Sequence, residues 1–323
     1  MIDEVRNTVL SVLNKNNYGY ISPSDFNLYA ANAQMEIYEE YFSAYNKTIN
    51  MENVRNSGTD YADIEAPLAE TLETFLVTNF LQNSAVSPSL PNSNYFYAPS
   101  ELTTGDTAYY ILKLLCHTNI ITSGTNSSVS TNLLVSSSGQ FTSLDITPGD
   151  IVVNVNTKKT ARVVVVFSDT TITLDSDIFT ATPNNYNIIS QNSKDVEKVS
   201  VGKITMLNNS NLTAPNNLFP AYTLEADYIK MYPNTINLFG QVEAVYFRHP
   251  KTPKWTYITL ANGEPVFDQS RPDYQDFELP REENYKLAMK ILQYAGVSIR
   301  ESEVAAFAIG QEQHEQPTFS QQQ

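Results

Sequence analysis

Two stretches in the last third of the chain decide how the rest is interpreted: Ala244–Tyr257, which reads AVYFRHPKTPKWTY, and Asp276–Arg300, which reads DFELPREENYKLAMKILQYAGVSIR. The first predicts a strand, a Pro-Lys-Thr-Pro turn and a second aromatic strand. The second has an acidic lead-in, a proline and apolar residues at helical spacing, and it predicts an amphipathic helix that ends at Gly296. No position in either stretch looks like a catalytic group. Both favour surfaces that pack, so the first hypothesis is a structural protein.

Composition limits the classes of partner. The 323 residues carry a net charge of −15 and no run of basic residues. Bulk attraction to nucleic acid is therefore not expected, because that attraction needs Lys and Arg to neutralise phosphates. An acidic surface would instead repel DNA from the wall of a channel. The 20 tyrosines and 15 phenylalanines suit both cores and half-wet interfaces.

Cys116 is the only cysteine, so a disulfide within the chain and a cysteine metal cluster are both excluded. It lies in an apolar run and is expected to be a buried small hydrophobe. The first residues lack the basic start and apolar core of a signal peptide, and no apolar run approaches the ~20 residues of a membrane helix. We expect a protein that stays inside the cell, without a membrane partner.

Residues 2–46 predict helices, with a restart at Ser22-Pro-Ser-Asp25 that combines a cap, a proline and an acid. The second of these helices has two apolar stripes, one through Phe26 and Ile37 and one through Tyr38 and Phe42. A helix that is apolar on two sides lies between two partners, and the second partner of a thin helical domain can be another subunit. A polar loop over 46–60 and a third helix over 64–80 follow. The full set expected at a subunit or partner interface is Phe26, Ile37, Tyr38, Tyr41, Phe42, Trp255, Tyr257, Tyr285 and Ile291.

The middle of the chain predicts short strands. Runs at 109–116, 151–155, 162–167, 171–174 and 186–189 argue for a small β-barrel or sandwich inserted between helical regions. Further strands are expected at 203–207, 222–224, 228–232, 242–248 and 255–260, and a short last helix at 301–309. The expected fold class is α+β, with a helical domain built from both ends of the chain around a large β insertion. We expect an N-terminal helical region over 1–83, the β insertion over 84–198, a second β-rich region over 199–275, a returning helical region over 276–310 and a flexible tail over 311–323.

The sequence contains no strong motif for catalysis, metal binding or nucleic-acid binding. No phosphate-binding glycine loop, G-x-S-x-G or H-E-x-x-H occurs, and the three histidines are isolated. Asp175 and Asp177 lack the glycine and terminal glutamate of a calcium loop, and a polar turn is the favoured interpretation. Aromatic and basic residues over 246–255 are favoured as a sheet face covered by lysine stems rather than a nucleic-acid contact. We therefore expect no catalytic residue, no metal site and no cofactor, and not an enzyme.

The chain resembles a virion structural protein of the crAss-like bacteriophages, the tailed phages of gut Bacteroides. The blocks that carry the resemblance bracket nearly the whole chain: Met1–Arg6, Asn16–Asn27, Ser57–Asp63, Pro250–Tyr257 and Asp276–Arg300. A further block over 147–180 is similar to a β-module of many phage neck and tail proteins.

Within that group the chain is most similar to the head-to-tail connector, the ring protein beneath the portal. The resemblance implies a virion protein of the neck or tail, made in the host bacterial cytoplasm and assembled as a ring of twelve copies. It implies the portal, further tail ring or hub proteins and tail fibres as partners, with DNA passing through the lumen without sequence-specific binding. The two-sided helices and the acidic balance agree with a ring, which closes when the rotation between neighbouring copies permits it.

Two alternatives stay open. One is another virion role, as a tail hub, a capsid-associated protein or a fibre anchor. The other is a tail-borne polysaccharide hydrolase, which would need two opposed carboxylates that the sequence does not single out. The tail from Gln311 has too little apolar content to fold alone, and we expect it to order only on assembly.

Overall fold

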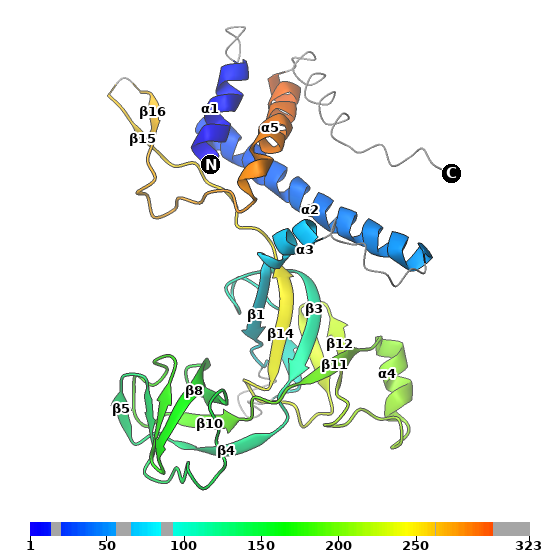
Figure 1. The fold of residues 1–323 in the computed structure, drawn as a ribbon, viewed down its shortest axis with the longest axis vertical. Helices are drawn as coiled ribbons and strands as arrows, with labels where there is room; N and C mark the ends of the chain where they lie inside the picture. Colours follow the sequence, from blue (N-terminus) through cyan, green and yellow to red (C-terminus); the bar gives the residue numbers. More distant parts are fainter. Residues whose placement is uncertain (14–20, 56–65, 85–92, 262, 300–323) are drawn as a thin grey trace. The chain divides into compact units, whose positions relative to one another are not determined.

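The computed structural model describes residues 1–13, 21–55, 66–84, 93–261 and 263–299. It is a mixed α+β structure, as the sequence predicts at that level. The chain divides into two units (Figure 1). The helical unit combines Met1–Phe75 with Pro250–Gln323, and the β unit is Leu76–His249.

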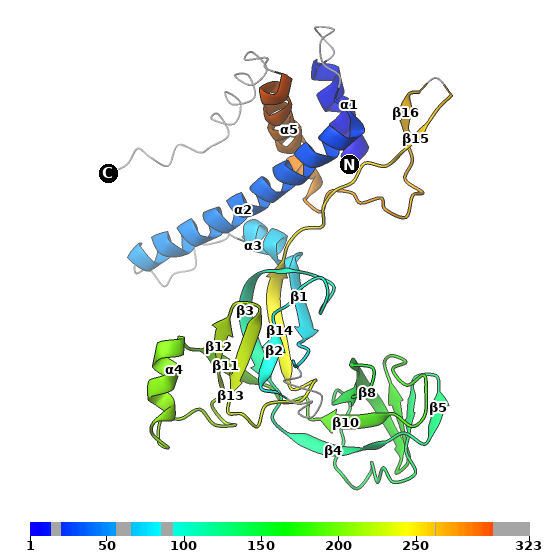
Figure 2. The same cartoon turned by 180° about the vertical axis from the view of Figure 1, so that it is seen from behind.

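The helical unit is built on contacts between the two ends of the chain. Helices α1 (Ile2–Leu13) and α2 (Pro23–Arg55) both contact α5 (Asn284–Ile299), which follows the short 3-10 helix η3 (Arg281–Glu283) (Figures 1 and 2). Helix α3 (Ala66–Glu73) contacts α2, and β15 (Tyr257–Thr259) pairs with β16 (Pro265–Phe267). The apolar stripes of α1 and α5, which include Val5, Val9, Leu287 and Ile291, are fully buried. Their 3.6-residue periodicity is what buries one face of each helix.

Polar contacts hold the start of α1 and the Trp255 side chain in place within this unit. Asp276 accepts from the backbone N–H of Ile2 at 2.8 Å and lies 3.2 Å from the N-terminal amine. It thus places a negative charge at the positive end of α1. The Trp255 side chain is buried beneath the Arg6 guanidinium, 3.8 Å from its ring, and its Nε1–H donates to Asp3 at 2.9 Å. Residues far apart in sequence are held together here.

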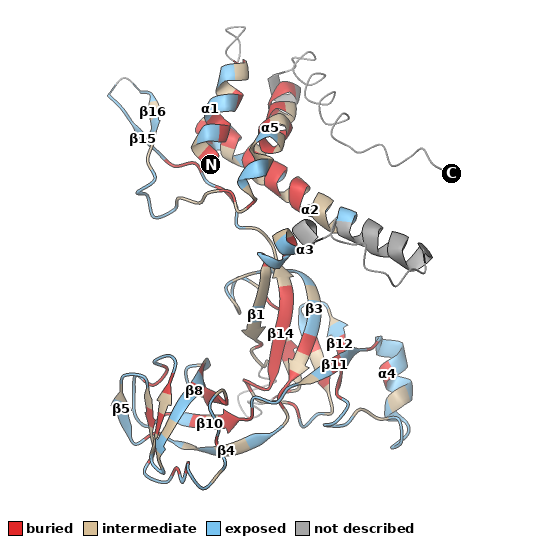
Figure 3. Ribbon diagram, in the orientation of Figure 1, coloured by how far each residue is buried: buried red, intermediate tan, exposed pale blue. Residues whose placement is uncertain are grey.

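The β unit contains a seven-stranded sheet in the order β1-β14-β3-β11-β12-β13-β2. The strands are β1 (Leu76–Phe80), β2 (Tyr95–Tyr97), β3 (Ala108–Cys116), β11 (Lys194–Lys198), β12 (Ala221–Glu225), β13 (Tyr228–Tyr232) and β14 (Val242–Arg248), and α4 (Val201–Asn208) contacts β12. The sheet curls, because β2 meets the continuation of β1: Tyr97 N–H donates to the Gln82 carbonyl and Ser84 N–H to the Tyr95 carbonyl. Its core includes Leu81, Phe96 and Cys116, and buried residues run along β14 (Figure 3).

Cys116 is buried as the sequence predicts, and burial raises the pKa of its thiol to about 12. It therefore acts as a small apolar residue of the core.

A second seven-stranded sheet runs in the order β4-β10-β7-β8-β9-β6-β5. Its strands are β4 (Ile120–Thr125), β5 (Ser128–Ser130), β6 (Leu133–Val135), β7 (Ile151–Asn154), β8 (Lys159–Ser168), β9 (Thr171–Leu174) and β10 (Asn185–Ile189). Only Asn126 and Ser127 separate β4 from β5, although these strands lie at opposite ends of the order. The sheet must therefore curl on itself, and it encloses a core around Phe141, Ile172 and Ile188.

The two sheets meet at a small apolar cluster. Ile151, Val153 and Ile189 of the second sheet pack with Phe239, against Phe80 of the first. The backbone of Gly240 passes so close to this cluster that a Cβ there would lie 2.4 Å from Val153 Cγ2. The junction depends on the absence of that side chain.

Several sequence expectations are wrong. The helix expected over 64–80 stops at Glu73 as α3, and Leu76–Phe80 is strand β1, because Val77 and Thr78 are β-branched and pair with β14. The strand expected over 203–207 is helix α4, which Ser200 caps by accepting from Lys203 N–H.

Two helix ends also differ from expectation. Helix α2 continues to Arg55, through most of the loop expected over 46–60. Gly296 lies buried inside α5 with a helical backbone rather than ending that helix. The helix expected over 301–309 and the tail 311–323 lie outside the described residues.

Candidate functional site

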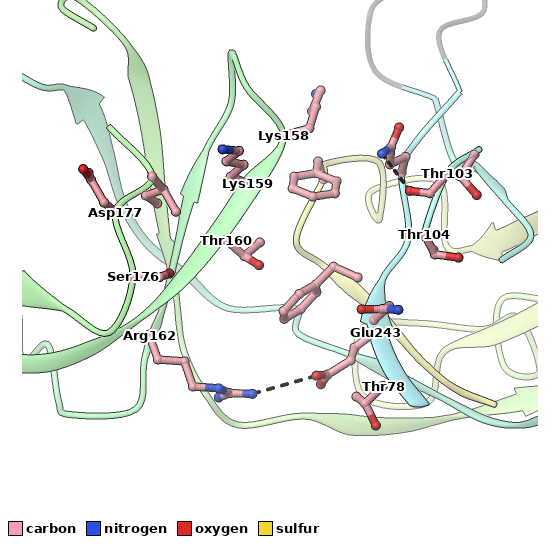
Figure 4. Close-up of a pocket in the computed structure, with 15 residues that line it drawn as sticks. Thr78, Thr103, Thr104, Lys158, Lys159, Thr160, Arg162, Ser176, Asp177 and Glu243 are labelled. Atoms are coloured by element: carbon pink, nitrogen blue, oxygen red, sulfur yellow. Dashed lines mark hydrogen bonds and ion pairs between the residues drawn. The ribbon is translucent and has the colours of Figure 1, made fainter. Parts of the chain in front are cut away.

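A cleft of about 590 Å³ opens within the β unit, between the edge of β1 and strand β8 (Figure 4). Its volume falls in the usual range of ligand pockets, about 300–1,000 Å³. The lining residues are Thr78, Asn79, Phe80, Gln82, Thr103, Thr104, Lys158, Lys159, Thr160, Arg162, Ser176, Asp177, Ile178, Phe239 and Glu243. Hydroxyl, amide and charged groups dominate this surface, with two aromatic rings between them.

The cleft meets β1 along its edge. Thr78, Asn79 and Phe80 all line it, although successive side chains of a strand point to opposite faces. A cavity can contact three consecutive residues in this way only where it runs beside the strand. β1 is the first strand of its sheet and, among the strands that the structure describes, pairs only with β14, so its other edge is the one that the cleft contacts.

The backbone groups on that edge follow from the pairing register. Leu81 N–H donates to the Val242 carbonyl, so the odd residues of β1 are hydrogen-bonded to β14. The even residues then point their N–H and C=O groups away from β14. Gln82 and Ser84 use these groups to pair with β2, but β2 ends at Tyr97. Among the described residues, the backbone groups of Thr78 and Phe80 on this edge have no partner.

Strand β8 supplies the opposite wall. Thr160 and Arg162 face the cleft, while Ala161 and Val163 alternate with them and enter the core of the second sheet. A tight turn precedes the strand, in which Asn154 Oδ1 accepts from the backbone N–H groups two and three residues further on. The turn ends at Lys158, whose φ is 56°. This asparagine turn positions the lysine at the mouth of the cleft.

An ion cluster forms the floor. The buried Glu243 carboxylate lies 3.2 Å from His117 Nε2 and 3.8 Å from the Arg162 guanidinium. The second His117 nitrogen, Nδ1, lies 3.2 Å from the Ser190 carbonyl. Glu243 of β14 is therefore held between the His117 imidazole and the Arg162 guanidinium, and its contact with Arg162 of β8 ties the first sheet to the second.

The two lysines at the mouth of the cleft differ from Arg162, which pairs with Glu243. Lys158 Nζ lies 5.6 Å from the centre of the Phe239 ring, and partial burial lowers the pKa of this lysine. Among the described residues, neither Lys158 nor Lys159 forms an ion pair. The lining holds three cations, Lys158, Lys159 and Arg162, against two carboxylates, Asp177 and Glu243, so its net charge is 3 − 2 = +1 in a chain of net charge −15. The arrangement suits binding of an anionic group beside an unpaired strand edge.

The predicted interface residues lie elsewhere, in the helical unit. Phe26, Ile37, Tyr38, Trp255 and Ile291 are fully buried within it. Their apolar character is thus accounted for by packing inside one chain, for example by Tyr38 against Phe42 and Phe75. Tyr41 is half-buried and donates from its hydroxyl to Glu283 at 2.8 Å.

Of the remaining three predicted residues, Phe42 is half-buried, and Tyr257 and Tyr285 are more exposed, by 40% and 46%. A role of any of the nine in contacts between subunits stays a prediction.

Sequence patterns alone do not indicate the cleft. Asp177 suggests at most a calcium loop, and the adjacent Lys158-Lys159 pair after Asn-Val-Asn-Thr is the one local signal of a basic site. The other half of the lining comes from β1, some eighty residues earlier, where the spacing of apolar residues predicts a helix. Within the described residues no group of three His, Cys, Asp or Glu side chains could hold a metal ion, and no described helix is long and apolar enough to cross a membrane.

Neither the comparison with protein-family models nor that with curated proteins finds a match to this chain.

Proposed function

We propose that this protein is a structural component of a tailed bacteriophage virion that forms a multi-copy ring in the neck. The ring would join the portal to the tail and line the passage for DNA. The resemblance to virion proteins of crAss-like phages suggests the identity of the assembly, and the distribution of exposed apolar side chains supports a role in protein–protein contact.

The supporting observation is a series of exposed large apolar residues on and after α4. Met206 is 74% exposed, Phe219 76% and Leu212 94%, and Val201 and Leu218 are more than half exposed. Single exposed apolar residues are ordinary, but a series within one short segment is typical of a surface that another protein covers. In a ring, each copy would cover this segment of the next.

The chain order is also compatible with a connector. Both ends of the chain build the helical unit, and the whole β unit is inserted between them. In the proposed ring the helical units would form the collar, and the β units would carry contacts to further tail proteins or fibres. The net charge of −15 would keep DNA from adhering to the lumen.

The deciding experiment is electron cryo-microscopy of the intact virion, with symmetry tested rather than assumed. Twelve copies directly beneath the portal would support the proposal. Three or six copies, or a location on the capsid or fibres, would contradict it and favour a tail hub or an anchor. Absence of the chain from the virion would overturn both.

The hydrolase alternative gains no specific support from the cleft. The cleft contains two carboxylates, Asp177 and Glu243, but Glu243 is held by His117 and Arg162. A general acid or nucleophile needs a carboxylate that faces the substrate. We therefore keep that reaction as a prediction that activity assays on purified protein would test.

A further inference from the structure

We infer that the cleft beside β1 is a strand-addition groove, and that its occupant is the acidic C-terminal segment, residues 300–323, of a second copy of this chain. The inference deepens the proposed ring, and the choice of a second copy rests on that proposal. The groove itself rests on the geometry of the β unit.

The unpaired edge of β1 carries the inference. In the segment 78–84, the even residues point their backbone N–H and C=O groups away from β14 and so form one continuous row. Of this row, β2 hydrogen-bonds Gln82 and Ser84. The row continues through Phe80 and Thr78, which both line the cleft. An incoming extended segment would continue the ladder that β2 begins, and such strand addition is an established mode of peptide recognition.

Natural sheets rarely leave such an edge uncovered, because unpaired strands promote unwanted association. β1 carries none of the usual protective devices, since its sequence, Leu-Val-Thr-Asn-Phe, has no proline, lysine or other charge. The cleft of about 590 Å³ beside this edge has room for a short extended segment. A row of this kind is thus better explained by a specific partner than by chance exposure.

The charges of the groove and of residues 300–323 are complementary. Lys158 and Lys159 line the groove and form no ion pair among the described residues, and with Arg162 they exceed the two carboxylates of the lining by one, so a bound strand should carry carboxylates. Residues 300–323 contain the glutamates 301, 303, 312 and 315 against the single basic residue Arg300, and thus have a net charge of 1 − 4 = −3 with histidine neutral. The part of this segment from Gln311 on has too little apolar content to form a core of its own, so a partner surface is the place where it can order.

The first test is a titration of a fluorescent synthetic peptide of residues 300–323 onto the chain truncated after Ile299, followed by anisotropy. We expect saturable binding that weakens as salt is added. Thr78→Pro removes one outward N–H without touching the ladder to β14, and it should weaken binding at least about tenfold. Thr78→Val keeps that N–H and should bind like the parent chain.

Charge reversal gives an independent comparison. Lys158→Glu with Lys159→Glu should weaken binding at least about tenfold. The control pair, Lys113→Glu with Lys198→Glu, makes the same change of net charge at exposed positions outside the cleft and should leave binding unchanged. Thermal unfolding of each variant verifies that the β unit remains folded.

The source of the segment is tested by light scattering of the full-length chain above the peptide's Kd. Association that is lost on truncation after Ile299 and in Thr78→Pro supports a second copy. A full-length chain that stays monomeric while the peptide binds the truncated chain overturns the second copy. Absence of peptide binding, or equal binding by Thr78→Pro and Thr78→Val, overturns the groove and leaves the ring proposal to be decided by copy number in the virion.

Discussion

At the scale of single residues, Gly240 decides how closely the two sheets of the β unit approach. Its φ is 90°, in the left-handed region that side chains disfavour, and a Cβ would lie 2.4 Å from Val153 Cγ2 and 3.2 Å from Ile189 Cδ1. Both the backbone conformation and the available space therefore require glycine. Because the ion cluster of Glu243 and the cleft lie beside this junction, the glycine also positions the candidate site.

Gly240→Ala is expected to destabilise the β unit by about 2 kcal/mol or more, because strain and overpacking add. The free energy of unfolding is measured by urea titration with far-UV circular dichroism. Gly202→Ala is the matched control, since Gly202 lies in α4 with no atom within 4 Å of an added Cβ. The free energy of unfolding of that control should rise by up to about 1 kcal/mol, because alanine has a higher helix propensity than glycine. Equal stability of the two variants would contradict the account of the junction.

At the scale of elements, α2 and α5 are joined by an ion network around the buried Lys290. Lys290 is 2% exposed and lies 3.0 Å from Glu36 and 2.8 Å from Glu40, while Lys286 lies 2.6 Å from Glu40. Burial of Glu40 by itself raises the pKa of its carboxyl, but the hydrogen bonds and charges of the two lysines outweigh it and hold that pKa below its ordinary value of 4.5. The contact between the helices therefore depends on pH.

The helical unit is expected to lose stability as the pH falls below about 4.5. A folded pKa below the unfolded one means that the carboxylate stabilises the fold above the unfolded value, and that this contribution disappears as the pH falls through the folded value. Trp255, the only tryptophan, lies in this unit and reports its unfolding by fluorescence. In a plot of the free energy of unfolding against pH, Glu40→Gln should reduce the loss of stability on the acid side. An unchanged plot would contradict the role of Glu40.

The link between α2 and the segment around Trp255 is a second contact between elements. Asn27 accepts from Trp255 N–H at 2.8 Å and donates to its carbonyl at 3.2 Å. Asn27→Ala leaves the backbone N–H and C=O of Trp255 unpaired, and we expect the free energy of unfolding to fall by about 1–3 kcal/mol. Trp255 fluorescence during urea unfolding measures it, with the exposed helix position Thr8→Ala as control. A loss no larger than that of the control would contradict the structural role of Asn27.

At the scale of the whole molecule, the β unit is inserted at one place in the helical unit. The chain leaves the helical unit after Phe75 into β1 and returns at Pro250 from β14. These strands are antiparallel neighbours, and Leu76 pairs with Phe247, so the two crossing points are close together.

Residues 1–75 joined to 250–323 through a short Gly-Ser linker should therefore fold without the β unit. The expected result is a cooperative thermal transition with a buried Trp255, seen as blue-shifted emission. The intact chain is the control, since its Trp255 emission should match. A shortened chain with exposed tryptophan and no transition would show that the helical unit depends on the β unit.

Much of the fold can be predicted from local pattern. The strands at 109–116, 171–174 and 228–232, the helix that starts at Pro23 and the burial of Cys116 are confirmed because alternation, capping and apolar runs act over a few residues. The apolar residues of Leu76–Phe80 fit both the helix and the strand period, and pairing with β14, more than 160 residues away, decides the conformation. Val201–Asn208 is also locally ambiguous, and the cap at Ser200 is the signal that distinguishes a helix there from a strand.

Composition and short-range periodicity are enough to establish the mixed α+β class, most of the strands, the acidic balance and the lack of a recognisable catalytic motif. Two features required the assembled fold: five of the nine predicted interface residues are buried within the helical unit, and an unpaired edge of β1 lies in the same cleft as Lys158 and Lys159. The physical reason is that a strand edge and a cleft arise from pairings between distant segments. Local propensity carries no information about which segments those are.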